Sequence, residues 1–228
     1  MSQTISFTRP DGGSVNGYLA GPAAGAPGIV VIQEWWGLNE QIRGVADRLA
    51  AAGYRALVPD LYRGKTALEA NEAEHLMKGL NFADAAGQDV RGAVQYLKAS
   101  GSARVGVTGF CMGGALTLLA ACNVPEADAA CIWYGYPPLE FVDATKIRIP
   151  LMGHWATDDA AFDIKGVDTL EEKLRAAGVA YEFFRYDCKH AFANETADSK
   201  NLPFLKYDAK AAELAWQRTM DFFARHLR

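Results

Sequence analysis

The sequence predicts an α/β protein with a mostly parallel central sheet, helices on both faces and an antiparallel hairpin at the N-terminus. Short apolar runs of strand length alternate with longer amphipathic stretches of helical spacing. The run at 28–33 is almost entirely apolar, as expected of a strand that is buried on both faces. A Pro-Asp-Gly-Gly turn at 10–13 separates two strand-like segments, which predicts the hairpin.

The first half of the chain supplies the hairpin, two inner strands and three helices. Strands are predicted at 5–8, 15–20, 28–33 and 55–59, and helices at 39–52, 66–80 and 84–99. In the first helix Ile42, Val45 and Leu49 lie on one stripe, and Gly53 follows as a stop signal. The helix at 84–99 carries a similar stripe that includes Val90. Each helix therefore has one apolar face to lay on a sheet.

The second half continues the alternation. Strands are predicted at 104–110, 129–134, 150–155 and 181–186, and helices at 114–122, 167–177 and 208–226. Strands that alternate with helices indicate right-handed crossovers between parallel neighbours. No repeat, low-complexity tract or linker interrupts this pattern, so a single domain over 1–228 is expected.

The composition of the chain argues against several classes of protein. Half of the 228 residues are hydrophobic, and 23 basic against 27 acidic residues give a net charge of −4, without the basic excess of a nucleic-acid binder. No apolar run reaches the roughly 18 residues of a membrane span. The N-terminus does not resemble a secretory signal, so a cytoplasmic protein with reduced cysteines is expected. The four cysteines show no CxxC spacing, so no metal site is expected.

Cys111 is the candidate nucleophile. Residues 109–113 read Gly-Phe-Cys-Met-Gly, and they lie where a predicted strand ends and a helix begins. A helix N-terminus favours a thiolate, and the N–H of Met112 can donate to an oxyanion. The alternative is a buried cysteine in a glycine-rich turn. In sheets of this kind ligands bind beyond the carboxyl ends of the strands, which favours the nucleophile.

A thiol nucleophile needs a histidine base and a carboxylate that orients it. His190 follows the last predicted strand, whereas His154 lies within a strand and is expected in the core. Asp158 and Asp159 follow the preceding strand, and Asp159 is favoured over Asp158 because Phe162 can anchor the loop behind it. The order Cys, Asp, His matches hydrolases with a Gly-x-nucleophile-x-Gly turn.

Glu34, Trp35 and Trp36 end the buried strand at 28–33 and suggest a pocket wall. A poorly solvated Glu34 carboxylate would have a raised pKa and could exchange a proton with the thiol. The backbone N–H of Trp35 could supply a second oxyanion donor. The alternative is a surface acid beside core aromatic residues.

Taken together, these segments resemble the dienelactone hydrolase family of α/β hydrolases over nearly the whole chain. The matching motifs are GIVVIQEWWGLN at 28–39, PDLY at 59–62, GFCMGG at 109–114, the two aspartates at 158–159, and KHAFA at 189–193. The resemblance implies an α/β-hydrolase fold, Cys111 as nucleophile, His190 as base and Asp159 as its acid. It also implies that Glu34 meets the resting thiol, and that the N–H groups of Trp35 and Met112 form the oxyanion hole. Members are cytoplasmic, monomeric and need no cofactor or metal.

One position departs from the family pattern. In aromatic-degrading members an arginine four residues after the histidine binds the dienelactone carboxylate, and here that position is Asn194. We therefore expect a hydrolase of activated esters or lactones that works through a thioester, with Trp36, Tyr134 and Asn194 as candidate substrate-binding residues. A general carboxylesterase or thioesterase-like enzyme, or a non-enzymatic protein with a reactive Cys111, are the alternatives.

Overall fold

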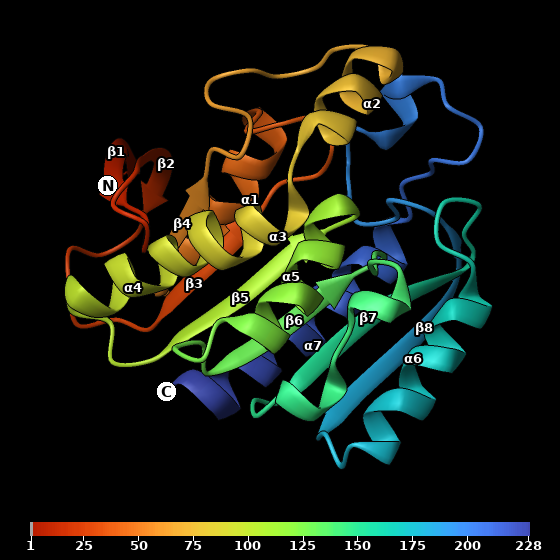
Figure 1. The fold of residues 1–228 in the computed structure, drawn as a ribbon. Coiled ribbons are helices and arrows are strands. Elements are labelled where there is room, and N and C mark those ends of the chain that lie inside the picture. The colour runs from red at the N-terminus through yellow and green to blue at the C-terminus, as the bar shows by residue number, and fades with distance from the viewer. Residues whose placement is uncertain (1) are drawn as a thin grey trace.

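The computed structural model describes residues 2–228, which form one eight-stranded sheet with strand order β1-β2-β4-β3-β5-β6-β7-β8 (Figure 1). The first two strands form an antiparallel hairpin, β2 is also antiparallel to β4, and the remaining neighbours are parallel. The strands are β1 Ser2–Thr8, β2 Ser14–Ala20, β3 Gly28–Ile32, β4 Arg55–Pro59, β5 Val105–Phe110, β6 Ala129–Trp133, β7 Leu151–Asp158 and β8 Tyr181–Lys189. The predicted sheet is confirmed.

Helices cover both faces of the sheet, as predicted (Figure 1). The helices are α1 Glu40–Ala51, α2 Ala70–Gly79, α3 Phe82–Asp84, α4 Arg91–Ala99, α5 Met112–Asn123, α6 Ile164–Ala176 and α7 Ala209–Leu227. In β3, Ile29 and Val31 join the core under α1 and α7, whereas Val30 and Ile32 join the core under α4 and α5. This alternation explains why β3 is apolar at every position. No helix within residues 2–228 has the length and hydropathy of a membrane span.

The helix predicted at 66–80 begins four residues late, at Ala70. Thr66 forms a β-bridge with Gly37, which keeps the chain extended there. The Glu72 carboxylate then accepts hydrogen bonds from the N–H groups of Leu68 at 3.1 Å and Glu69 at 3.4 Å. These bonds satisfy N–H groups at the start of the helix and fix where it begins.

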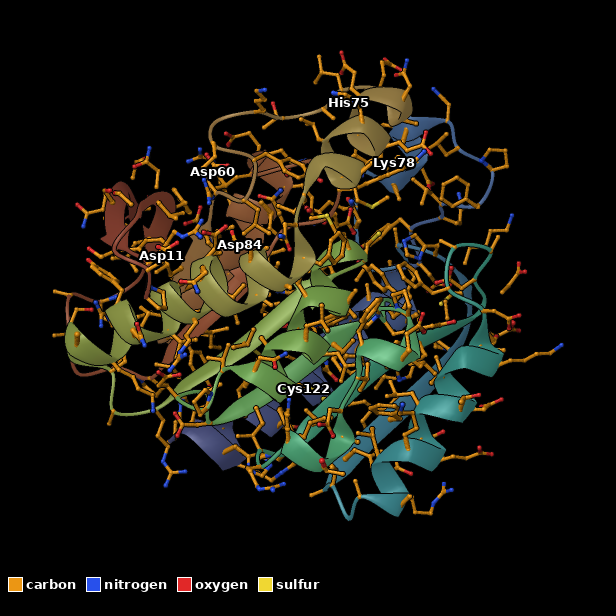
Figure 2. All side chains as sticks on the ribbon, viewed as in Figure 1. Asp11, Asp60, His75, Lys78, Asp84 and Cys122 are labelled. Carbon is orange, nitrogen blue, oxygen red and sulfur yellow. The ribbon has the colours of Figure 1, made fainter. Side chains whose placement is uncertain are left out.

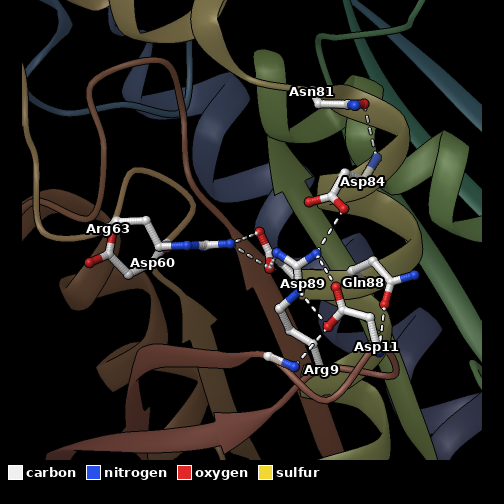
Figure 3. Close-up of polar contacts among 9 residues, drawn as sticks. Arg9, Asp11, Asp60, Arg63, Asn81, Asp84, Gln88 and Asp89 are labelled. Carbon is white, nitrogen blue, oxygen red and sulfur yellow. Dashed lines mark hydrogen bonds and ion pairs between the residues drawn. The ribbon is translucent and has the colours of Figure 1, made fainter.

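The segment predicted as a helix at 84–99 is helical throughout, but its first part is a π-helix at Ala85–Val90 that joins α3 to α4. The wider turn of a π-helix brings residues five apart toward the same face. Asp84 and the buried Asp89 both reach Arg9, at 2.7 and 3.2 Å. Arg63 binds Asp89 from the other side, at 2.9 and 3.0 Å (Figure 3).

This ion cluster joins the N-terminal hairpin, the π-helix and the loop after β4 (Figure 3). The same loop carries Tyr62, whose hydroxyl lies 3.3 Å from the sulfur of Met112. Met112 is the first residue of α5 and directly follows Cys111. The cluster therefore supports the loop that packs against the start of α5.

Strands β7 and β8 both run three residues beyond their predicted ends. A bulge between Ala156 and Asp158 lets the pairing continue, and Asp158 lies opposite Lys189. Cys188, two residues beyond the predicted end of the strand at 181–186, therefore lies in β8. Because the two neighbouring strands end side by side, Asp159 and His190 are the first residues beyond them.

Candidate active site

Cys111 occupies a strained turn between β5 and α5. Its φ of +55° and ψ of −118° are unfavourable for a residue with a Cβ atom, and such strain is typical of functional positions. The turn is fixed by its own backbone: the N–H of Cys111 donates to the carbonyl of Trp133 at 3.0 Å, and its carbonyl accepts from Gly114 at 2.9 Å. The half-buried thiol is thereby held at the N-terminus of a 12-residue helix.

Glycines surround this turn because backbone segments touch there. A Cβ atom at Gly109 would overlap the carbonyl of Gly113, and a Cβ atom at Gly113 would overlap the carbonyl of Ile32. A Cβ atom at Gly135 would overlap the carbonyl of Cys111 itself. Gly135 is a further residue of this turn that we did not predict, although a glycine directly after the apolar strand at 129–134 was an available signal.

Replacing Gly135 with alanine is expected to lower the free energy of unfolding by about 3 kcal/mol, because the new methyl group forces the cysteine turn to move. Urea unfolding measures this loss. The matched control is Gly44→Ala in α1, where a Cβ atom has no neighbour within 4 Å and where stability should rise by up to about 1 kcal/mol. Equal effects of the two substitutions would contradict the proposed packing.

His190 and Asp159 form a buried pair beyond the ends of β8 and β7. Nδ1 of His190 lies 2.7 Å from Oδ2 of Asp159, and each side chain is 2% exposed. The second carboxylate oxygen of Asp159 accepts from the N–H groups of Ala161 at 2.8 Å and Phe162 at 2.9 Å. The structure thus brings Asp159 to the histidine, while Asp158 ends β7 as an exposed residue.

The Cys111 thiol lies close enough to His190 to influence its protonation. Burial by itself lowers the pKa of His190, but the neighbouring Cys111 and the Asp159 carboxylate outweigh burial and raise that pKa to about 10. The histidine therefore has a strong preference for the proton when a negative charge is on the sulfur.

Aromatic rings enclose the imidazole of His190. The ring of Tyr134 meets it edge-on at 5.2 Å, and the rings of Phe162 and Phe204 lie at 5.5 and 6.4 Å. These contacts help to leave His190 only 2% exposed. Such an apolar surrounding strengthens the charge interactions among the histidine, the thiol and the carboxylate.

Glu34 is buried at the end of β3, and both of its carboxylate oxygens accept hydrogen bonds. The Tyr134 hydroxyl donates to Oε1 at 3.2 Å, and the Asn194 amide donates to Oε2 at 2.7 Å. Burial raises the pKa of Glu34, while His190 and the two donors lower it in part. We expected Glu34 to meet the resting thiol; within residues 2–228 its hydrogen bonds go to Tyr134 and Asn194 instead.

The other residues expected at the site lie around this core. Met112 begins α5, so its N–H has no acceptor within the helix. Trp35 is half-buried and packs edge-on against the buried Trp36 at 5.1 Å. The Nζ of Lys200 lies 4.0 Å above the ring of Trp36. Trp36, Tyr134 and Asn194, our candidate substrate-binding residues, are each no more than 2% exposed and contact other protein groups.

The other three cysteines have thiols whose pKa is raised by burial. Burial raises the pKa of Cys122, on α5 (Figure 2), to about 11, and that of Cys131 and Cys188 to about 12. These thiols are therefore protonated at neutral pH, and a protonated thiol is a poor nucleophile.

The remaining histidines lie away from the cysteine turn. His154 is fully buried between the hydroxyls of Tyr186 at 2.9 Å and Thr219 at 2.8 Å, as the sequence analysis expected for a core residue. His75 is exposed on α2 (Figure 2). His226 is half-buried in α7 rather than exposed as its terminal position suggests.

Comparisons with known proteins show which family this chain resembles. The model of the "Dienelactone hydrolase family" matches residues 15–227. "Protein usf" of Aquifex pyrophilus is 34% identical, and "Putative carboxymethylenebutenolidase" of Aquifex aeolicus is 31% identical, each over 100% of both chains. The solved structure of "Putative Dienelactone Hydrolase" from Klebsiella pneumoniae has a TM-score of 0.83 and 27% identity, and it covers 99% of this chain and 100% of its own. The chain, which has the α/β-hydrolase fold, belongs to the dienelactone hydrolase family.

Proposed function

We propose that this chain hydrolyses activated carboxylic esters or lactones with a Cys111-His190-Asp159 triad and a thioester intermediate. The observation that carries the proposal is the 2.7 Å contact between His190 and Asp159 beside a strained cysteine at a helix N-terminus. Membership of the dienelactone hydrolase family and the names of the relatives support the same reaction class. We propose further that it acts on small molecules as a cytoplasmic monomer without a resident cofactor.

In the first half-reaction the Cys111 thiolate attacks the substrate carbonyl, and a carbon–sulfur bond forms. The N–H groups of Trp35 and Met112 hold the oxyanion, and each such donor lowers the barrier by about 2.7–4 kcal/mol. The carbon–oxygen bond to the leaving group then breaks, and the leaving oxygen takes the proton from His190. The product of this step is the thioester with a neutral histidine.

In the second half-reaction His190 removes a proton from a water molecule, which attacks the thioester. The carbon–sulfur bond breaks, the acid leaves, and the thiolate–imidazolium pair is restored. Thiolate is itself a good leaving group, so an unactivated ester would expel the sulfur again rather than its alkoxide. The chemistry therefore favours activated substrates such as aryl esters and enol lactones.

The decisive experiment measures steady-state turnover on a panel of enol lactones, saturated lactones, aryl esters and thioesters, with the thioester of Cys111 trapped and identified by mass spectrometry. Preferential turnover of enol lactones and aryl esters supports the proposal. Turnover across the whole panel without preference favours a general carboxylesterase or thioesterase. Modification of Cys111 without turnover of any substrate favours the non-enzymatic reactive-thiol protein.

We expect a neutral substrate to be preferred over an anionic one of the same shape. Glu34 is a buried acid near His190, and the Asn194 amide is already occupied by that carboxylate. A lactone with a free carboxylate should therefore have a kcat/KM about tenfold lower than its methyl ester. This corresponds to a free energy of activation that is higher by about 1.4 kcal/mol. Initial rates with the acid and its ester give the comparison, and a preference for the acid would contradict it.

A further inference from the structure

The Tyr134 hydroxyl and the Asn194 amide hold Glu34 from two different loops. Tyr134 follows β6 with a φ of +38°, and the next residue, Gly135, packs directly on the carbonyl of Cys111. The Tyr134 ring also meets the His190 ring edge-on at 5.2 Å. One tyrosine thus contacts Glu34 and the proposed base at once, from a backbone position that the cysteine turn fixes.

The orientation of the Asn194 amide is determined by its own neighbours. Its oxygen accepts from the N–H of Thr196 at 2.9 Å and from the Thr196 hydroxyl at 2.7 Å. The backbone N–H of Thr196 can only donate, so the amide oxygen must face Thr196 and the NH₂ group must face Glu34. The 2.7 Å contact with Oε2 of Glu34 is therefore a donated hydrogen bond.

Burial raises the pKa of Glu34, and His190 and the two donated hydrogen bonds oppose that rise because they favour the ionised carboxylate. The charged or titratable groups that face Glu34 are His190, Tyr134 and Glu195, and His190 is the cation among them. His190 is faced in turn by Cys111 and Asp159. Because Tyr134 contacts both Glu34 and the ring of His190, a negative charge on Glu34 acts on His190 in addition to the charge of Asp159.

We propose that Tyr134 and Asn194 are positioning residues that hold Glu34 as a fixed carboxylate near His190, and that this charge sets the pH range over which His190 keeps its proton. The role of this charge in the reaction rests on the proposed function. It differs from a direct proton exchange between Glu34 and the thiol, because Glu34 keeps its proton state here and acts through its charge on His190, while Tyr134 and Asn194 hold its two oxygens.

The experiment follows the imidazole signal of His190 by NMR as the pH is raised, in the wild type and in Glu34→Gln, Tyr134→Phe and Asn194→Leu. His190→Gln identifies the signal among the four histidines. Each of the three variants removes either the charge of Glu34 or one of the two donors that support this charge. The midpoint of the His190 titration should therefore fall by about one pH unit. Tyr134→Phe keeps the ring against His190, which separates loss of the donor from loss of packing. The matched control is Thr196→Ala, which removes one bond to the amide oxygen but leaves the donor to Glu34, and its midpoint should not move.

A second readout, the rate of Cys111 alkylation by iodoacetamide against pH, separates the two roles of Glu34. If the alkylation profile moves in Glu34→Gln while the His190 midpoint stays, direct exchange with the thiol is correct and the inference is overturned. A His190 midpoint that is unchanged in Tyr134→Phe and Asn194→Leu also overturns it. Lack of turnover by the wild type would refute the proposed function, yet the His190 titration would still test this inference.

Discussion

Replacing Cys111 with alanine is expected to lower kcat for an aryl ester by at least about 10⁴-fold, because the thioester pathway disappears with the sulfur. Only binding and the oxyanion donors would remain to accelerate the reaction. Turnover of p-nitrophenyl acetate measures the loss. Mass spectrometry of the quenched reaction should show no acyl group on the variant.

The control for this substitution is Cys188→Ser. Cys188 is half-buried like Cys111, but it lies in β8 and burial raises its pKa to about 12. Its replacement by serine should leave kcat within about twofold, since a thiol with so high a pKa stays protonated and serine has nearly the same size. If Cys111→Ala retained more than a tenth of the wild-type turnover, Cys111 could not be the nucleophile.

Replacing Asp159 with asparagine is expected to lower kcat/KM by about 10³–10⁴-fold. The side chain keeps its shape, and its oxygen can still accept from the N–H groups of Ala161 and Phe162. The amide nitrogen then faces Nδ1 of His190 and donates where the carboxylate accepted. This selects the wrong tautomer and removes the charge that supports the imidazolium.

Asp158→Asn is the matched control, because Asp158 is the adjacent aspartate but is exposed at the end of β7. Its kcat/KM should stay within about threefold of the wild type. Thermal unfolding of both variants checks that any difference arises in the reaction rather than in folding. A larger loss in Asp158→Asn than in Asp159→Asn would reverse the assignment of the acid.

The sequence by itself determined the sheet and the identity of the candidate nucleophile, because both depend on local requirements. The run at 28–33 is short and rich in valine and isoleucine, which is the pattern of a strand buried on both faces. A cysteine with a positive φ between β5 and α5 requires glycine at positions 109 and 113. These positions lie close to the cysteine in the chain, so the motif can be recognised from a short stretch of sequence. The position of His190 after the last strand follows from the order of elements, which the sequence also contains.

Only the tertiary structure decided which distant groups meet. The aspartate that reaches His190 depends on the bulge in β7 and on the pairing of Asp158 with Lys189, and side chains alternate between faces along a strand. The partners of Glu34 lie 100 and 160 residues away along the chain. Such contacts are set by how loops from separate strands converge, and hydrophobic periodicity carries no information about that convergence.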